Sequence, residues 1–127
     1  MLREFIRAKI HRATITEAEV DYIGSITIDP DLLEAADMME GEKVQVLSCD
    51  NGERLETYII WGERGSGEIC MNGPAALKIG VGHTVIVIAY GLMTAEEEIL
   101  CRQTQTEQQS PSVPRASSGE RSGLRPS

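Results

Sequence analysis

Hydrophobic and polar residues alternate along much of the chain, a pattern that predicts short β-strands. Residues 8–15 alternate in this way, and a strand there would place Lys9 and His11 on one face. Residues 22–28 predict a second strand, which Gly24 interrupts. A glycine inside a strand often marks a bulge or a close approach of another stretch of backbone, so this position needs a structural explanation.

Further short strands are predicted at residues 43–48, 55–61, 68–71 and 84–90. Asn51-Gly52 is typical of a hairpin turn and lies between the first two of them. Residues 16–19 are polar and are expected to form a connection. Because so many short strands leave exposed edges, closure into a small β-barrel is expected, and the fold class is mainly β with short helices.

Two short helices are predicted among these strands. Pro30 suits a first helical turn, and the apolar spacing after it predicts a helix to about Met39, closed by Gly41. Residues 94–97 have the spacing of a capping box, which predicts a short acidic helix through about Cys101.

The composition changes after Arg102. Residues 103–127 consist mainly of Gln, Ser, Thr, Pro, Gly and Arg, with too few apolar residues to fold, so a disordered tail is predicted. Residues 1–102 would then form one domain, as the length of 127 residues favours.

The formal net charge is −8, which argues against a nucleic-acid partner, because such proteins need a basic surface. Cations nevertheless crowd the start of the chain, where an anionic substrate could bind, at Arg3, Arg7, Lys9 and Arg12. No apolar run is long enough to span a membrane and no apolar signal segment is found, so a cytoplasmic protein is expected. The three cysteines and two histidines lack metal-ligand spacing, and no metal is expected.

Gly24-Ser25 is the first candidate for chemistry. A serine hydroxyl can attack the preceding carbonyl, and β-elimination from the resulting ester cuts the chain and leaves a residue that becomes a pyruvoyl group. Glycine on the acyl side suits this reaction because it tolerates strained dihedral angles. The alternative is a plain strand bulge, and a second copy of the dipeptide, Gly65-Ser66, is expected at a hairpin tip.

Residues 54–58 are the second candidate. On a strand, Arg54, Glu56 and Tyr58 share one face while Thr57 points to the other. Arg54 could bind a carboxylate through two hydrogen bonds, and Tyr58 could donate a proton. The alternative is a solvated charge pair beside a cross-strand aromatic side chain.

The segment from Asn72 to Ala76 is the third candidate, and Pro74 predicts that one helical turn begins in it. Asn72 could be the cap of this turn. Alternatively, the free N–H groups of a helix start could bind an anion. Because proline has no N–H, the donors would be Gly73, Ala75 or Ala76.

Taken together, these motifs make the chain closely resemble bacterial aspartate 1-decarboxylases over residues 1 to about 100. The order and spacing of the matching segments carry the resemblance, and these segments are residues 9–12, 22–29, 51–54, 57–58, 63–67, 72–76 and 81–82. One departure is Pro74, where the family often has alanine, so the loop has one N–H fewer.

The resemblance implies a double-psi β-barrel, a homotetramer, and self-cleavage into residues 1–24 and 25–127. It implies that Ser25 becomes the pyruvoyl group, which forms a Schiff base with L-aspartate and accepts the electrons left by CO₂. Tyr58 would then protonate the carbanion. No metal and no pyridoxal phosphate would be needed.

Roles for further residues are implied in the same way. The resemblance implies that Arg54 and Lys9 are the cations that bind the substrate carboxylates, and that Thr57 also assists the cleavage. The substrate would be held by Thr57 and the loop Gly73-Pro74-Ala75, with support from His11, Asn72 and Tyr22.

The product implied is β-alanine for pantothenate and coenzyme A biosynthesis. Two alternatives stay open at this point: a non-enzymatic β-barrel that binds a ligand, and a pyruvoyl-dependent decarboxylase of another amino acid. An accessory protein that promotes maturation is also left open beside unaided cleavage.

Overall fold

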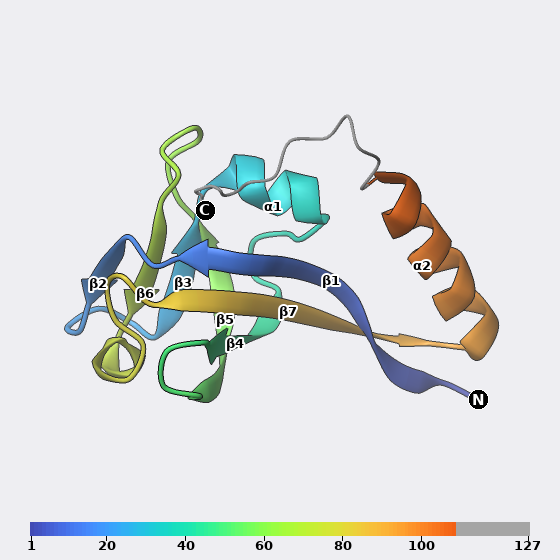
Figure 1. Cartoon of the computed structure of the whole chain (residues 1–127), viewed down its shortest axis with the longest axis horizontal. Helices are drawn as coiled ribbons and strands as arrows, with labels where there is room; N and C mark the ends of the chain where they lie inside the picture. The colour runs from blue at the N-terminus through green and yellow to red at the C-terminus, as the bar shows by residue number, and fades with distance from the viewer. Residues whose placement is uncertain (109–127) are drawn as a thin grey trace.

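The structure, a computed structural model, describes residues 1–108, with side chains as far as Gln103. Its elements in chain order are β1 (Arg3–Thr14), β2 (Glu17–Glu19), β3 (Ser25–Ile28), α1 (Pro30–Ala36), β4 (Lys43–Ser48), β5 (Arg54–Trp61), β6 (Ile69–Asn72), the 3₁₀ turn η1 (Pro74–Leu77), β7 (Thr84–Met93) and α2 (Ala95–Gln108). Figure 1 shows β1 and β7 as long neighbouring ribbons, with α2 near one end of the pair and β2, β3 and β6 near the other.

The strands form one mixed sheet in the order β1-β7-β4-β5-β3-β6-β2. The pairs among β1, β7, β4 and β5 are antiparallel. β3 runs parallel to β5 and antiparallel to β6, and β2 is parallel to β6. The two neighbours of β3 in the sheet, β5 and β6, both lie far from β3 in the sequence. The chain therefore has to cross over to place them beside it.

Apolar residues at every second position of the central strands form the core. In β4, Val44 and Val46 are buried while Lys43 is exposed, which confirms the strand predicted at residues 43–48. Val85 and Val87 of β7 are fully buried too, and Val87 pairs with Val46. Period-two alternation thus separates an inner face from an outer one, as the pleat of a strand requires.

Several expected boundaries were wrong. Residues 16–19 are not only a connection, because Glu17–Glu19 form β2 and pair with β6. The strand expected over 22–28 begins only at Ser25. The first helix ends at Ala36, and Asp37 closes it in a left-handed conformation (φ 59°), not Gly41. An aspartate tolerates that conformation better than most residues with a side chain, so it can end a helix as glycine does.

The second helix begins as predicted and ends later. Thr94 N donates to Glu97 Oε1 at 2.8 Å, and Glu97 N donates to Thr94 Oγ1 at 3.1 Å, so the capping box is confirmed. α2 continues to Gln108, so residues 103–108, assigned to the disordered tail, are helical. The rest of that tail, 109–127, lies outside the described residues. In the described part of the chain, no helix has the length and apolar character that a membrane crossing needs.

Candidate active site

Three neighbouring strands bring together the segments that carry the candidate chemistry. β3 lies between β5 and β6, and Ser25 at the start of β3 pairs with Asn72 at the end of β6. In the parallel pair of β3 and β5, Ile26 lies opposite Ile59, so Ser25 and Tyr58 each precede the paired residues by one position. The backbone therefore places Ser25 next to both of the other motifs.

The Ser25 side chain is fully buried, and its hydroxyl has two hydrogen-bond partners. Asn72 Nδ2 donates to Ser25 Oγ at 2.9 Å, while Ser25 Oγ donates to the Ile23 carbonyl at 3.3 Å. Asn72 Nδ2 also donates to Thr27 Oγ1 at 2.8 Å. The hydroxyl is thus held in one orientation inside the protein, which is how a reacting group is prepared.

The idea that Asn72 caps the helical turn was wrong. The cap residue of η1 is Gly73, and it makes no side-chain capping hydrogen bond. The Asn72 amide turns instead towards β3, because antiparallel pairing puts it directly opposite Ser25.

Gly73 allows two stretches of backbone to approach closely at the expected cleavage point. A Cβ at Gly73 would lie 2.8 Å from Gly24 Cα, 2.9 Å from Gly24 N and 3.1 Å from the Tyr22 carbonyl oxygen. The φ angle of Gly73 is +84°, which also favours glycine. This contact explains why a glycine is needed beside the start of β3.

The loop after Asn72 is less available to an anion than expected. Gly73 N donates to the Glu19 carbonyl at 2.7 Å, and Ala76 N donates to the Gly73 carbonyl at 2.9 Å. Both N–H groups are therefore used within the chain, which leaves them less available to an anion than the N–H of Ala75. A substrate-binding role for this loop stays a prediction.

The outer face of β5 has the residues predicted for it. Arg54, Glu56 and Tyr58 are exposed, whereas Thr57 is half-buried on the other side. A solvated charge pair is present on this strand, and its cation comes from β4: Glu56 Oε1 lies 3.7 Å from Lys43 Nζ. Arg54 Nη1 donates to Gln45 Oε1 at 2.6 Å. Tyr58 is 39% exposed, so its phenol can reach a molecule bound at the surface.

Lys9 lies on the same sheet but far from Arg54. The register runs from Lys9 on β1 through Ile88 on β7 and Gln45 on β4 to Glu56 on β5. Three strand spacings separate β1 from β5, which is roughly 14 Å. Within one chain, the two cations can meet one small dicarboxylate only if both long side chains extend towards each other across β7 and β4. Of the expected supporting residues, His11 is exposed on β1 and Tyr22 is exposed before β3.

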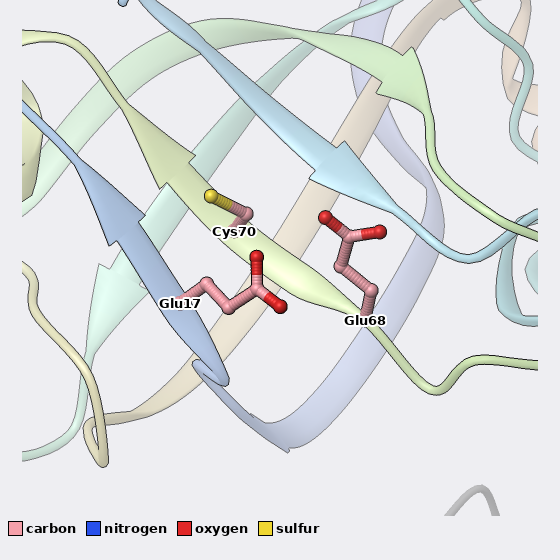
Figure 2. Close-up of side chains that lie close together, drawn as sticks. All are labelled: Glu17, Glu68 and Cys70. Carbon is pink, nitrogen blue, oxygen red and sulfur yellow. The ribbon is translucent and has the colours of Figure 1, made fainter. Parts of the chain in front are cut away.

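Sequence reasoning missed Cys70, which lies two positions before Asn72 on β6 and so on the same face of the strand. Its thiol is buried and donates to Asn72 Oδ1 at 3.2 Å. Figure 2 shows the thiol close to the carboxylates of Glu17 and Glu68, and these three side chains offer ligand atoms within 4.8 Å of one another. Burial, and then the charges of Glu17, Glu68 and Glu19, raise the pKa of Cys70 to about 11. At neutral pH this sulfur is therefore a protonated thiol.

Two cavities among the described residues lie elsewhere on the molecule. One of about 480 Å³ is lined by Arg7, Asp37 and residues 39–42, and one of about 410 Å³ is lined by residues that include Glu4, Gln45 and Tyr90. Neither is lined by Ser25, Tyr58 or Asn72.

Comparison with known proteins gives a consistent result. The model of the family described as aspartate decarboxylase matches residues 1–108. The chain is 61% identical over 97 residues to the aspartate 1-decarboxylase of Bacillus cytotoxicus, covering 76% of each chain. It has the same identity and coverage with the aspartate 1-decarboxylase of Caldicellulosiruptor saccharolyticus, also over 97 residues.

A solved structure shows the fold. The crystal structure of the computationally designed msDPBB_sym2 protein matches with a TM-score of 0.50 and 14% sequence identity, covering 68% of this chain and 99% of that chain. The fold is a double-psi β-barrel, as expected, in which strands are the main secondary structure beside two short helices.

Proposed function

The chain belongs to the aspartate decarboxylase family and decarboxylates L-aspartate to β-alanine and CO₂, and we propose that it first cuts its own backbone between Gly24 and Ser25. The observation that carries the proposal is the buried Ser25 hydroxyl, held by Asn72 at the point where Gly73 lies against Gly24. Such burial has a cost for a polar group, and a reactive role accounts for it.

The cut is an internal rearrangement followed by elimination. Ser25 Oγ forms a bond to the Gly24 carbonyl carbon as the peptide C–N bond breaks, and the Oγ proton passes to the freed nitrogen. Loss of the Ser25 Cα proton then breaks the Cβ–Oγ bond and releases the Gly24 carboxylate. The enamine that remains takes up one water and loses one ammonia, which leaves a pyruvoyl group at the start of residues 25–127.

The surroundings of Ser25 fit this group. The side chain lies in a fully buried position at a strand end, and the Cβ direction of Gly24 is open, while Gly73 packs closely against the Gly24 backbone. The pyruvoyl ketone supplies an electron sink for decarboxylation, so the proposal includes neither a metal nor pyridoxal phosphate.

The remaining roles belong to side chains around this point. Tyr58, beside Ser25 in register, holds the proton that is delivered to Cα of the product. Arg54 binds a substrate carboxylate in a bidentate manner, and Lys9 contributes the second charge. Thr57 aids the cut, and together with Pro74 and Ala75 it borders the substrate.

The distance between the two cations supports assembly. Because the strands of Lys9 and Arg54 lie roughly 14 Å apart across the sheet, a second copy that contributes one of the two cations would bring them closer to one aspartate. Large apolar side chains near the site are exposed in the single chain, among them Ile23 (70%), Trp61 (52%) and Leu77 (75%). A homotetramer that covers them is part of the proposal, and light scattering of the purified protein tests it.

The biological setting follows from the product. The enzyme supplies β-alanine for pantothenate biosynthesis, and a cytoplasmic location, expected from the sequence, belongs to the same proposal. A net charge of −8 supports the expectation that no nucleic acid takes part.

Denaturing mass spectrometry of the purified protein tests the cut directly. We expect two chains, residues 1–24 and residues 25–127 with a pyruvoyl start, to appear without protease. A preparation that stays intact after prolonged warming would contradict unaided cleavage and favour a barrel that only binds a ligand.

Substrate charge is tested by the turnover of aspartate, asparagine and alanine. Arg54→Lys keeps the charge but loses the planar pair of donors, so it should raise KM for aspartate strongly in a folded, cleaved protein. Because the net charge of −8 repels a dianion, rising salt should weaken capture by the local cations. If the wild type turns over asparagine as fast as it turns over aspartate, no cation recognises the side-chain carboxylate of the substrate.

A further inference from the structure

We propose that Cys70 is a positioning residue for the self-cleavage: its thiol fixes which end of the Asn72 amide faces the Ser25 hydroxyl. The inference rests on the proposed function and deepens it by adding a residue that acts on Ser25 through Asn72. It arises from a chain of three buried groups, in which Cys70 Sγ donates to Asn72 Oδ1 at 3.2 Å and Asn72 Nδ2 donates to Ser25 Oγ at 2.9 Å.

The thiol is the partner that decides the orientation of the amide. The two hydroxyls that face Asn72 Nδ2, those of Ser25 and Thr27, can each donate or accept, so either amide orientation would satisfy them. A protonated thiol is a donor and only a weak acceptor. Its two acceptors are Asn72 Oδ1 at 3.2 Å and the more distant Met71 carbonyl at 3.8 Å, so the thiol favours the amide oxygen on its side. The hydroxyls would accept either orientation of the Asn72 amide, and Cys70 therefore selects one of the two.

The acidic neighbours of Cys70 keep the thiol a donor. Glu17 lies beside it on β2, with Glu17 opposite Cys70 in the register, and Glu68 immediately precedes β6, as Figure 2 shows. Their negative charges and the burial of the sulfur oppose loss of the proton. A thiolate would repel Asn72 Oδ1 and favour the flipped amide.

The orientation matters for the attacking oxygen. With Nδ2 towards Ser25, the amide donates to Oγ and the Oγ proton points to the Ile23 carbonyl, so the rotation of the hydroxyl is fixed and the carbonyl can accept that proton as Oγ attacks. With the amide flipped, Oδ1 would accept the Oγ proton instead, and the hydroxyl would leave this orientation. Loss of the thiol donor should therefore slow the cut.

The experiment follows the cleaved fraction of full-length precursors by denaturing mass spectrometry after rapid purification in the cold. Cys70→Ala should cleave about tenfold more slowly than the wild type, the effect of losing one buried hydrogen bond. Cys70→Ser keeps a donor and should recover most of the rate. Cys49→Ala, at an exposed cysteine, is the matched control and should cleave at the wild-type rate.

A double-mutant cycle separates positioning from a purely structural effect. In an Asn72→Ala background, Cys70→Ala should cause no further slowing, because the amide through which it acts is absent. Equal additional slowing in that background would overturn the inference, as would a Cys70→Ala protein that cleaves at the wild-type rate. A wild type that never cleaves would contradict the proposed function itself, whereas these outcomes contradict only the role of Cys70.

Discussion

The dipeptide Gly-Ser occurs at two places in this chain, Gly24-Ser25 and Gly65-Ser66, and the structure treats them differently. Ser25 is fully buried at the first residue of β3, whereas Ser66 is exposed in the turn that connects β5 to β6. The same dipeptide is thus buried at one place and exposed to water at the other. Only Ser25 lies among side chains that can orient its hydroxyl.

The hydrogen-bond partners of Ser66 give the second Gly-Ser copy a structural role. Ser66 Oγ donates to the Glu63 carbonyl at 2.6 Å and accepts from Glu68 N at 3.1 Å, so its hydroxyl closes a turn. The neighbouring N–H groups of Gly65 and Gly67 bind the Asp29 carboxylate at 3.1 and 2.8 Å. That carboxylate also caps α1, so the second copy fastens a loop to a helix start.

The comparison teaches that hydrogen-bond partners, not the dipeptide, give a serine its chemistry. At Gly24-Ser25 the donor to the hydroxyl is a side-chain amide from the neighbouring strand β6. At Gly65-Ser66 the hydroxyl is used by main-chain groups of its own turn.

The largest expected effect comes from removing each hydroxyl in turn. Ser25→Ala should abolish the cut completely, because no nucleophile remains next to Gly24. Ser66→Ala, the matched change in the other copy, should leave cleavage intact and lower stability by about 1 kcal/mol at most. Mass spectra of both variants check the contrast, and any cleavage of Ser25→Ala at the same bond would remove Ser25 as the attacking group.

The sequence allowed much of the fold to be predicted, because its local rules agree with the tertiary structure. The alternation over residues 43–48 and the capping box at Thr94 both survive unchanged, since each depends on neighbours within a few positions. The strand β2 was missed because Glu17–Glu19 carries no apolar pattern, and it exists only by pairing with β6. Long-range pairing of that kind leaves no local signal.

The site was predictable to a similar degree. Ser25, Tyr58 and Asn72 were identified and lie at adjacent strand positions. The helix-cap idea for Asn72 failed because local spacing could not reveal the cross-strand contact with Ser25. Cys70 was considered only as one of three cysteines without metal-ligand spacing, although its spacing of two from Asn72 on a strand was the available signal.

The second prediction separates making the reactive group from using it. Tyr58→Phe should still cut at Ser25, because the phenol is not among the groups that hold the hydroxyl. The cleaved variant should lose decarboxylation by roughly 10²–10⁴-fold, the usual contribution of a general acid. Turnover per cleaved chain is the measurement, and near-normal kcat would remove Tyr58 from this role.

The third prediction compares a glycine from each region. Gly73→Ala should destabilise the protein by about 2 kcal/mol or more and displace the cleavage point, since its Cβ would meet Gly24 backbone atoms at 2.8 and 2.9 Å. Gly67→Ala has a similar positive φ of +72° but open space around it, so it should cost only about 1 kcal/mol. Chemical denaturation gives both values, and equal costs would show that the approach to Gly24 relaxes freely.

The smallest expected effect concerns the ion pairs beside Gly65-Ser66. Arg64 donates two hydrogen bonds to Glu34, at 3.0 and 2.8 Å, and lies 2.6 Å from Asp31, and all three side chains are exposed. The hydrogen bonds from Arg64, followed by its charge, hold the pKa of Glu34 below its ordinary value of 4.5.

Because the folded protein lowers the pKa of Glu34, the pair stabilises it above that ordinary value, and the stabilisation is lost as the pH falls through the lowered pKa. Arg64→Gln should therefore lower Tm slightly at pH 7 and leave it unchanged once Glu34 is protonated. Screening makes the difference small even at neutral pH, and added salt should reduce it further. Cleavage at Gly24-Ser25 should proceed at the wild-type rate in this variant, since its contacts belong to the other Gly-Ser region. The hydrogen bonds of Arg64 and those of Ser25 share no residue, so no coupling between the two regions is expected among the described residues. Slower cleavage in an Arg64→Gln protein of unchanged Tm would show that the two regions are coupled.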